Sequence, residues 1–262
     1  MHQIAFVLGP LTVRWYGVMA ALGFLAAVLV IQRNRKFADL KPEQVSDLML
    51  YTIVAGIGGA RLFYVIQFWS QFKNNLFEIV RIDHGGLVFY GGFICATIVV
   101  ITYCHKKKLS IIKVLDIVGP GLALGHAFGR VGCFMNGCCF GKPGNLPWCF
   151  VAPAGTHPGQ KYPEIALHPV QLYETAGNLI IFAILFYFAG KLKKGMNFSL
   201  YLIMYGALRF VDEFFRGDHS DFLFGMFTQA QVIGIVLIPI GTALFFYFKS
   251  RKNDLEPVDK KC

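Results

Sequence analysis

Charged residues are scarce in this sequence. Asp, Glu, Lys and Arg make up 15% of the 262 residues, whereas soluble domains have about 25%. Hydrophobic residues make up 55%, and the mean hydropathy is +0.53. A chain this apolar has too little polar surface to cover a soluble fold. The composition therefore excludes an ordinary soluble domain and favours the lipid bilayer as its surroundings.

Three other features are missing. The start, Met1-His2-Gln3-Ile4, has no basic region and no small-residue cleavage site, so we expect the first apolar run to remain as a helix. The seven cysteines are scattered and do not form the framework of a disulfide-rich domain. There is no internal repeat, linker or low-complexity segment. We therefore expect residues 1–262 to form a single polytopic membrane domain.

Long apolar runs fill most of the chain. A bilayer core of about 30 Å requires roughly 20 mostly apolar residues per helix. The sequence predicts an all-α integral membrane protein with seven transmembrane helices, at 12–32, 46–68, 87–104, 114–134, 169–190, 197–215 and 228–248.

The basic residues predict the orientation. Sixteen of the 25 lie in the odd-numbered connections, which follow the first, third and fifth spans, and in the C-terminal tail. Six lie in the even-numbered connections or at the outer end of the first span, and three lie inside spans. Cytoplasmic loops carry the excess of Lys and Arg, so we expect the N-terminus outside and the C-terminus in the cytoplasm. The net charge of +10 is thus spread over short loops, and no aromatic-studded basic face predicts binding to nucleic acid.

Segment 135–168 is predicted to be the one long non-helical stretch. It is rich in Gly, Pro and aromatic residues and lies between the fourth and fifth spans, on the outer side. Loops of this length inside compact proteins are usually functional.

Three arginines, Arg61, Arg130 and Arg209, fall inside predicted spans. A charge at a helix centre costs about 2.5–3.5 kcal/mol even on the mildest scale, so each needs a partner or a wet cavity. All three are predicted to lie in the outer half of the bilayer, where converging guanidiniums would bind a lipid phosphate. The alternative is ion pairing with Asp212, Glu213 or Glu174, or snorkelling to the interface.

A polar face is predicted on the sixth span. Tyr205, Arg209, Glu213 and Arg216 follow one another at offsets of four, four and three residues, which share one face of a helix. An Arg–Glu–Arg series on this face would orient each guanidinium and leave net positive charge. Surface pairing near the interface is the simpler explanation for Glu213 and Arg216, but not for Arg209.

Two further motifs open predicted helices. Segment 84–92 begins with His84 and carries two pairs of glycines, which permit close approach of a ligand or, more simply, tight helix packing. His168 and Gln171 open the fifth span beside Pro169, which suits a first helical turn. We expect both to face the site, and capping of the helix is the alternative.

The densest group of motif residues lies in segment 129–141. Arg130 stands there among glycines that would let a headgroup approach the backbone. Cys133, Cys138, Cys139 and Cys149 have the spacing C-x4-C-C-x9-C, which matches no zinc pattern. The spacing therefore predicts buried thiols or one disulfide, with no metal and no cofactor.

Taken together these motifs resemble the prolipoprotein diacylglyceryl transferase family of bacteria. The resemblance covers nearly the whole chain in order, at residues 14–17, 59–62, 85–92, 129–141, 168–174, 205–218 and 228–231. It implies seven spans with the N-terminus outside, in the bacterial inner membrane, with the active site towards the periplasm. The implied reaction moves a diacylglyceryl group from phosphatidylglycerol to the lipobox cysteine of a prolipoprotein, forming a thioether and releasing glycerol phosphate.

The resemblance also implies roles for individual residues. Arg130 and Arg209 match the family's essential arginines and would stabilise the developing phosphate charge. Other motif positions are matched by Tyr16, Asn136, Gly141, Tyr205, Glu213 and Arg216.

The sequence departs from the family at three positions. Tyr90 stands where many members have the histidine of Phe-His-Gly-Gly, a proposed base. Tyr90 or His84 is therefore expected to take the thiol proton. Cys133 and Cys138 stand where the family usually has Asn and Glu. These changes leave open a divergent relative that uses the same lipid donor on another acceptor. A lipid-binding or anion-binding transporter is a third reading, but such proteins tend to show internal repeats.

Overall fold

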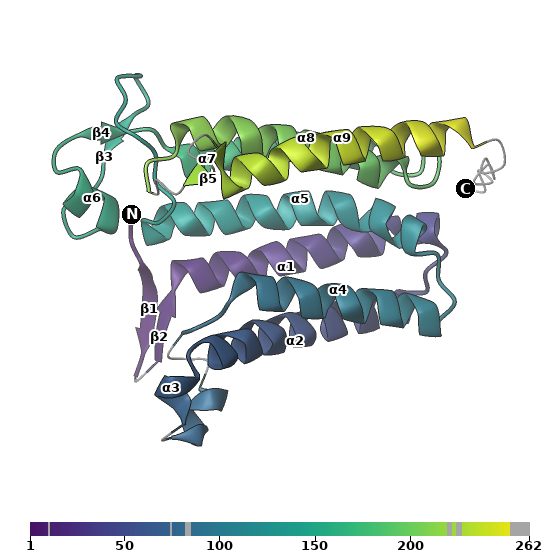
Figure 1. The fold of residues 1–262 in the computed structure, drawn as a ribbon, viewed down its shortest axis with the longest axis horizontal. Helices are drawn as coiled ribbons and strands as arrows, with labels where there is room; N and C mark the ends of the chain where they lie inside the picture. The colour runs from purple at the N-terminus through teal and green to yellow at the C-terminus, as the bar shows by residue number, and fades with distance from the viewer. Residues whose placement is uncertain (10, 74, 82–84, 219–221, 224–226, 252–262) are drawn as a thin grey trace. The chain divides into compact units, whose positions relative to one another are not determined.

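The computed structural model of the chain describes residues 1–9, 11–73, 75–81, 85–218, 222–223 and 227–251. These residues are mostly helical (Figure 1). Six of their helices are long and apolar enough to cross a membrane: α1 (Trp15–Asn34, extended by the 3₁₀ turn η1, Arg35–Ala38), α2 (Pro42–Gln67), α4 (Phe89–Lys106), α5 (Ile111–Asn136), α7 (Val170–Phe188) and α9 (Gln229–Ser250). The chain is therefore a multi-pass membrane protein. The span predicted at 197–215 corresponds to α8 (Met196–Asp212), which at 17 residues is shorter than these six.

Short elements complete the described chain. They are the strands β1 (Ile4–Leu8), β2 (Leu11–Arg14), β3 (Phe150–Val151), β4 (Ala166–Leu167), β5 (Phe222–Leu223) and β6 (Phe227–Thr228), and the short helices α3 (Trp69–Phe72), η2 (Leu76–Val80), α6 (His157–Lys161) and η4 (Glu213–Phe215). The strands form three antiparallel pairs, β1 with β2, β3 with β4 and β5 with β6. The prediction that 135–168 is wholly non-helical is wrong in detail, because a one-turn helix and a strand pair shape that segment. The Thr156 hydroxyl accepts from the Gly159 N–H and caps the short helix.

The helices pack into two compact units. One comprises residues 1–37 and 115–262, and the other comprises residues 38–114. In the first unit α8 and α9 run side by side (Figure 1). Their contact is close because Gly206 and Gly234 face one another: a Cβ on Gly234 would lie 2.7 Å from the Gly206 carbonyl oxygen. Small residues of this kind let helices approach in a bilayer, where the hydrophobic effect does not drive them together.

Asp116 of α5 fixes the beginning of α8. Its carboxylate accepts the N–H of Gly195 at 2.6 Å and that of Phe198 at 2.8 Å, so it satisfies two amides of the first helical turn. A negative charge there also complements the positive end of the helix dipole. Gly195 has φ +90°, a conformation that glycine adopts without strain.

The second unit is built on the pair α2 and α4. Gly59 and Gly91 face one another so closely that a Cβ on Gly59 would lie 2.6 Å from the Gly91 carbonyl oxygen. A Cβ on Gly92 would likewise lie 2.8 Å from the carbonyl oxygen of Gly56. The second glycine pair of segment 84–92 thus serves tight helix packing, the simpler of the two readings of that motif.

Candidate active site

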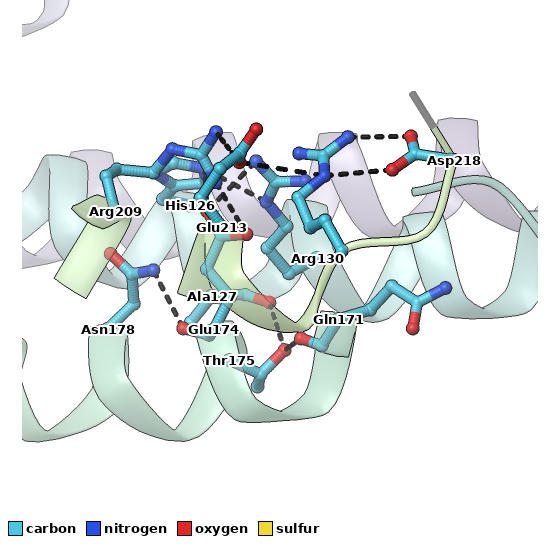
Figure 2. Close-up of polar contacts among 11 residues, drawn as sticks. His126, Ala127, Arg130, Gln171, Glu174, Thr175, Asn178, Arg209, Glu213 and Asp218 are labelled. Carbon is cyan, nitrogen blue, oxygen red and sulfur yellow. Dashed lines mark hydrogen bonds and ion pairs between the residues drawn. The ribbon is translucent and has the colours of Figure 1, made fainter. Parts of the chain in front are cut away.

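The site is organised around Glu174, in the first turns of α7. The side chain of Glu174 is 1% exposed, and Asn178 donates a hydrogen bond to its main-chain carbonyl at 2.8 Å. Thr175 on the same helix donates to the carbonyl oxygen of Ala127 on α5 at 3.4 Å and so ties α7 to α5 (Figure 2). The carboxylate is thus held on a rigid element beside α5.

Both oxygens of Glu174 contact arginines. Oε1 lies 2.9 Å from Nη2 of Arg130 on α5, and Oε2 lies 3.5 Å from Nη1 of Arg209 on α8. One buried carboxylate therefore joins guanidiniums from two other helices (Figure 2). Removing one partner of such a buried pair leaves an uncompensated charge, which typically costs about 3–5 kcal/mol. The pairing with Glu174 is one of the alternatives that the sequence left open.

The network continues along the predicted polar face of α8. Arg209 Nη2 lies 3.3 Å from Glu213 Oε2, and the same oxygen lies 3.9 Å from Nε of Arg216. The Arg–Glu–Arg series is therefore confirmed as a structural feature, although α8 ends at Asp212 and a 3₁₀ turn carries Glu213. Arg216 in turn forms a two-pronged pair with Asp218 at 3.0 and 2.7 Å. Burial lowers the pKa of Arg216, but its bonds to Asp218 outweigh this and raise it above its usual value.

The charge balance of the network differs from the prediction. Three guanidiniums, those of Arg130, Arg209 and Arg216, alternate with the three carboxylates of Glu174, Glu213 and Asp218. The expectation of net positive charge is therefore wrong, because Glu174 and Asp218 balance the series. The arrangement holds the guanidiniums in place before a ligand arrives and still leaves donors, since a guanidinium has five N–H groups. Within the part of the chain that the structure describes, Nη1 of Arg130 pairs with no carboxylate.

His126 lies one helical turn before Arg130 and belongs to the same cluster. Its Nε2 accepts from Nε of Arg130 at 3.3 Å and lies 3.5 Å from Oε1 of Glu174. Its ring packs against that of Tyr205, with centroids 5.3 Å apart. Accepting from an arginine requires an unprotonated Nε2, so the imidazole is a neutral base beside two guanidiniums.

Other predicted site residues frame this cluster. The Tyr16 phenol, at the start of α1, is close enough to Arg130 and to the thiols of residues 133, 138 and 139 to interact with them electrostatically. Asn136 ends α5, and its side chain hydrogen-bonds the Cys138 thiol. Hydrogen bonds from the thiols of residues 133 and 139, together with that from Asn136, lower the pKa of Cys138 and outweigh the effect of burial.

Three further predicted residues stabilise the loop that follows α5. Gln171 donates to the Cys138 carbonyl at 2.8 Å. Gly141 is bridged to Arg216 by backbone pairing, and a Cβ there would lie 2.3 Å from the His168 carbonyl oxygen. His168 Nδ1 lies 3.1 Å from the hydroxyl of Tyr173. These contacts give Gln171, Gly141 and His168 a part in positioning the loop against α7 and the Arg216 segment.

The comparisons with known proteins agree with the resemblance. Residues 3–247 match the family model described as prolipoprotein diacylglyceryl transferase. A phosphatidylglycerol–prolipoprotein diacylglyceryl transferase of Finegoldia magna is 35% identical over 254 residues, which are 96% of this chain and 97% of the relative. Proteins of the same name in Clostridium tetani and Fervidobacterium nodosum are each 36% identical, over 97% of this chain and over 100% and 88% of the respective relative.

The chain belongs to the prolipoprotein diacylglyceryl transferase family. The two arginines that Glu174 joins, Arg130 and Arg209, are those that the resemblance assigned to the family's essential positions. The sequence named Glu174 only as one possible ion-pair partner and did not single out His126. The sequence did indicate His126, because His126 and Arg130 are four residues apart on one helix and therefore share a face.

Arg61 was expected to bind a lipid phosphate, but its contacts in the structure are with the backbone. It lies in the second unit, where its five N–H donors go to five backbone carbonyls, those of Glu78, Ile79, Arg81, Gly85 and Gly86. The side chain is buried and stacks on Phe72 at 5.2 Å. No N–H is left for a phosphate, so the expected substrate contact is replaced by a structural one: Arg61 holds the segment that precedes α4.

Neither of the two bases expected from the sequence, Tyr90 and His84, is tested by the described contacts. Tyr90, in the first turn of α4, is 58% exposed and packs its ring edge-on against Phe89 at 5.9 Å. His84 lies outside the described residues. Both stay predictions.

Proposed function

We propose that this chain transfers a diacylglyceryl group from phosphatidylglycerol to the lipobox cysteine thiol of prolipoproteins, the first step of lipoprotein maturation. The observation that carries the proposal is the placement of Arg130 and Arg209 on the two oxygens of one buried carboxylate, at 2.9 and 3.5 Å. The family membership and the names of the relatives support the same reaction.

The chemistry assigns each group a task. The thiol sulfur attacks the glyceryl carbon that carries the phosphate, a carbon–sulfur bond forms, and the carbon–oxygen bond to phosphate breaks. Charge develops on the phosphate oxygens, where preorganised guanidinium donors stabilise it most. Arg130 and Arg209 supply those donors, and Glu174 keeps them oriented while the site is empty.

The thiol must lose its proton, because the thiolate is the nucleophile. His126 is well placed to accept it, since Nε2 is unprotonated and lies beside the arginines. When Arg130 turns its donors to the phosphate, Nε2 is released to accept the proton, and Glu174 stabilises the imidazolium. Tyr90 and His84 stay the alternatives that the sequence provides.

We also propose the topology and location. α8 crosses the membrane as a seventh span, because its 17 residues reach the lower limit of about 17–25 residues for a spanning helix. The N-terminus lies outside and the C-terminus in the cytoplasm of the bacterial inner membrane, as the distribution of basic residues favours. The active site then faces the periplasm.

The test is a transfer assay. Purified protein is mixed with phosphatidylglycerol and a lipobox peptide, and mass spectrometry follows the thioether-linked diacylglyceryl product and the released glycerol phosphate. The proposal predicts both products, and neither with a peptide whose cysteine is changed to serine. Folded protein that binds phosphatidylglycerol without forming product contradicts it and favours the divergent acceptor.

A further inference from the structure

Three thiols meet beside the arginine network. The Sγ atoms of Cys133, Cys138 and Cys139 all lie within 4.8 Å of one another. Cys133 is in the last turn of α5, and the other two follow where the chain leaves that helix. The sequence spacing matched no metal-binding pattern, because the close approach depends on how the chain turns after Asn136.

Hydrogen bonds hold the turn that brings the three thiols together. The N–H of Cys138 donates to the carbonyl of Cys133 at 3.2 Å, and the carbonyl of Cys138 accepts from Gln171. Cys139 has φ +58°, a left-handed conformation that costs a non-glycine residue about 1–3 kcal/mol and persists only where the surroundings enforce it. The thiols are therefore held together by the fold before any ligand binds.

The separation and chemistry of the thiols suit a metal ion. Zinc–sulfur bonds are about 2.3 Å long, so two sulfurs on one tetrahedral zinc lie about 3.8 Å apart. The sulfur–sulfur separation of about 3.8 Å that zinc requires is within the 4.8 Å limit on the distances between the three Sγ atoms. Thiolates select zinc and other soft cations, and three thiolates on a divalent ion carry a net charge of −1. The guanidiniums of Arg130 and Arg216 both interact electrostatically with Cys139 and would balance that charge.

We propose that Cys133, Cys138 and Cys139 bind one zinc-class cation and leave its fourth position for the acceptor thiol. Three protein ligands plus one open position is the arrangement of catalytic zinc sites. A thiol that coordinates zinc is deprotonated outright. Its proton passes to a base or to water, and the metal-bound thiolate attacks the glyceryl carbon as the phosphate leaves. The use of the open position rests on the proposed function, whereas the binding of the metal does not.

The first measurement uses the metal alone. Reduced, purified protein without a histidine tag is titrated with Co²⁺ and then with competing Zn²⁺. We expect about one Co²⁺ per chain with thiolate-to-cobalt charge-transfer bands, and displacement by zinc. Cys138→Ser should lose the bands, and the matched control Cys149→Ser should keep them because its sulfur faces His168 at 3.8 Å. Absence of binding while all three thiols react with a thiol reagent overturns the proposal, and this result needs no variant.

The second measurement separates the metal from the transferase. A lipobox peptide should change the cobalt spectrum, and the peptide with serine in place of cysteine should not. An unchanged cobalt spectrum would overturn the proposal that the open position binds the acceptor thiol. Metal-free protein should transfer at least tenfold more slowly than the zinc-loaded protein. Equal rates overturn the catalytic role and leave the proposed function intact, whereas no transfer by either form contradicts the proposed function itself.

Discussion

Glu174 of α7 and Arg130 of α5 form an ion pair of 2.9 Å on a carboxylate that is 1% exposed. The other oxygen of this carboxylate contacts Arg209, so a single side chain sets the relative positions of the two arginines assigned to the phosphate. Glu174 is therefore a positioning residue. Its removal should slow the chemical step without weakening the binding of phosphatidylglycerol.

Glu174→Gln tests this role. The change raises the net charge of the cluster by one and weakens the hold on both guanidiniums. We expect the KM for phosphatidylglycerol to fall, because the arginines are less neutralised, and kcat to fall about 10²-fold, because the donors are less well placed. Steady-state kinetics with the exposed variant Glu164→Gln as control measures both. An unchanged kcat would mean that the carboxylate only stabilises the fold.

His126→Gln and Tyr90→Phe separate the candidate bases. General-base catalysis contributes about 10²–10⁴-fold, and we expect a loss of this size for His126→Gln. The remaining rate should rise steadily with pH, because the thiol must then ionise without help. Transfer rates measured across pH for both variants decide the assignment. Normal turnover by His126→Gln together with a slow Tyr90→Phe would return the role to Tyr90.

Gly59→Ala should destabilise the second unit. The new Cβ would lie 2.5 Å from the Cβ of Cys95 and 2.6 Å from the carbonyl oxygen of Gly91, so the α2–α4 pair must separate. Overpacking of this kind costs about 1–3 kcal/mol. Gly58→Ala on the same helix is the control, since its Cβ meets nothing within 4 Å. Thermal unfolding in detergent should show a lower Tm for Gly59→Ala only, and equal Tm values would refute the close helix contact.

Asp116→Asn should loosen the beginning of α8. Its carboxylate accepts two amide hydrogens there, and the neutral side chain keeps one good acceptor at most. Hydrogen bonds to a charged acceptor contribute about 1.5–3 kcal/mol, and we expect a loss of this order in the free energy of unfolding. Asp39→Asn is the control, because Asp39 is 71% exposed and its pair with Lys113 contributes little. Equal losses in the two variants would speak against a specific role for Asp116.

The helices were largely predictable, because apolar runs of membrane length are visible in the sequence: the predicted 114–134 became Ile111–Asn136, and 169–190 became Val170–Phe188. The β1–β2 pair was missed, since the predicted first span began at residue 12 and took in most of β2, and no element was predicted for residues 4–8 despite the Gly9-Pro10 turn signal in the sequence.

Site residues within one helix were predictable, and contacts between helices were not. Arg209 and Glu213 follow from helical periodicity. By contrast, periodicity does not say that Glu174 stands between Arg130 and Arg209, or that Arg61 meets only backbone carbonyls. The three thiols were likewise hidden, because their approach depends on a turn with φ +74° at Gly137 and φ +58° at Cys139.

The most direct test of the account is a double-mutant cycle on the two arginines. Transfer rates are measured for the wild type, Arg130→Lys, Arg209→Lys and the double variant, with Arg33→Lys as a control for insertion and folding. A lysine cannot make the paired contacts of a guanidinium, and we expect each single variant to lose about 10²–10³-fold. Because both side chains act through one carboxylate and on one phosphate, the double variant should be little slower than the worse single variant. Losses that multiply, or single variants that transfer normally, would contradict a shared phosphate site.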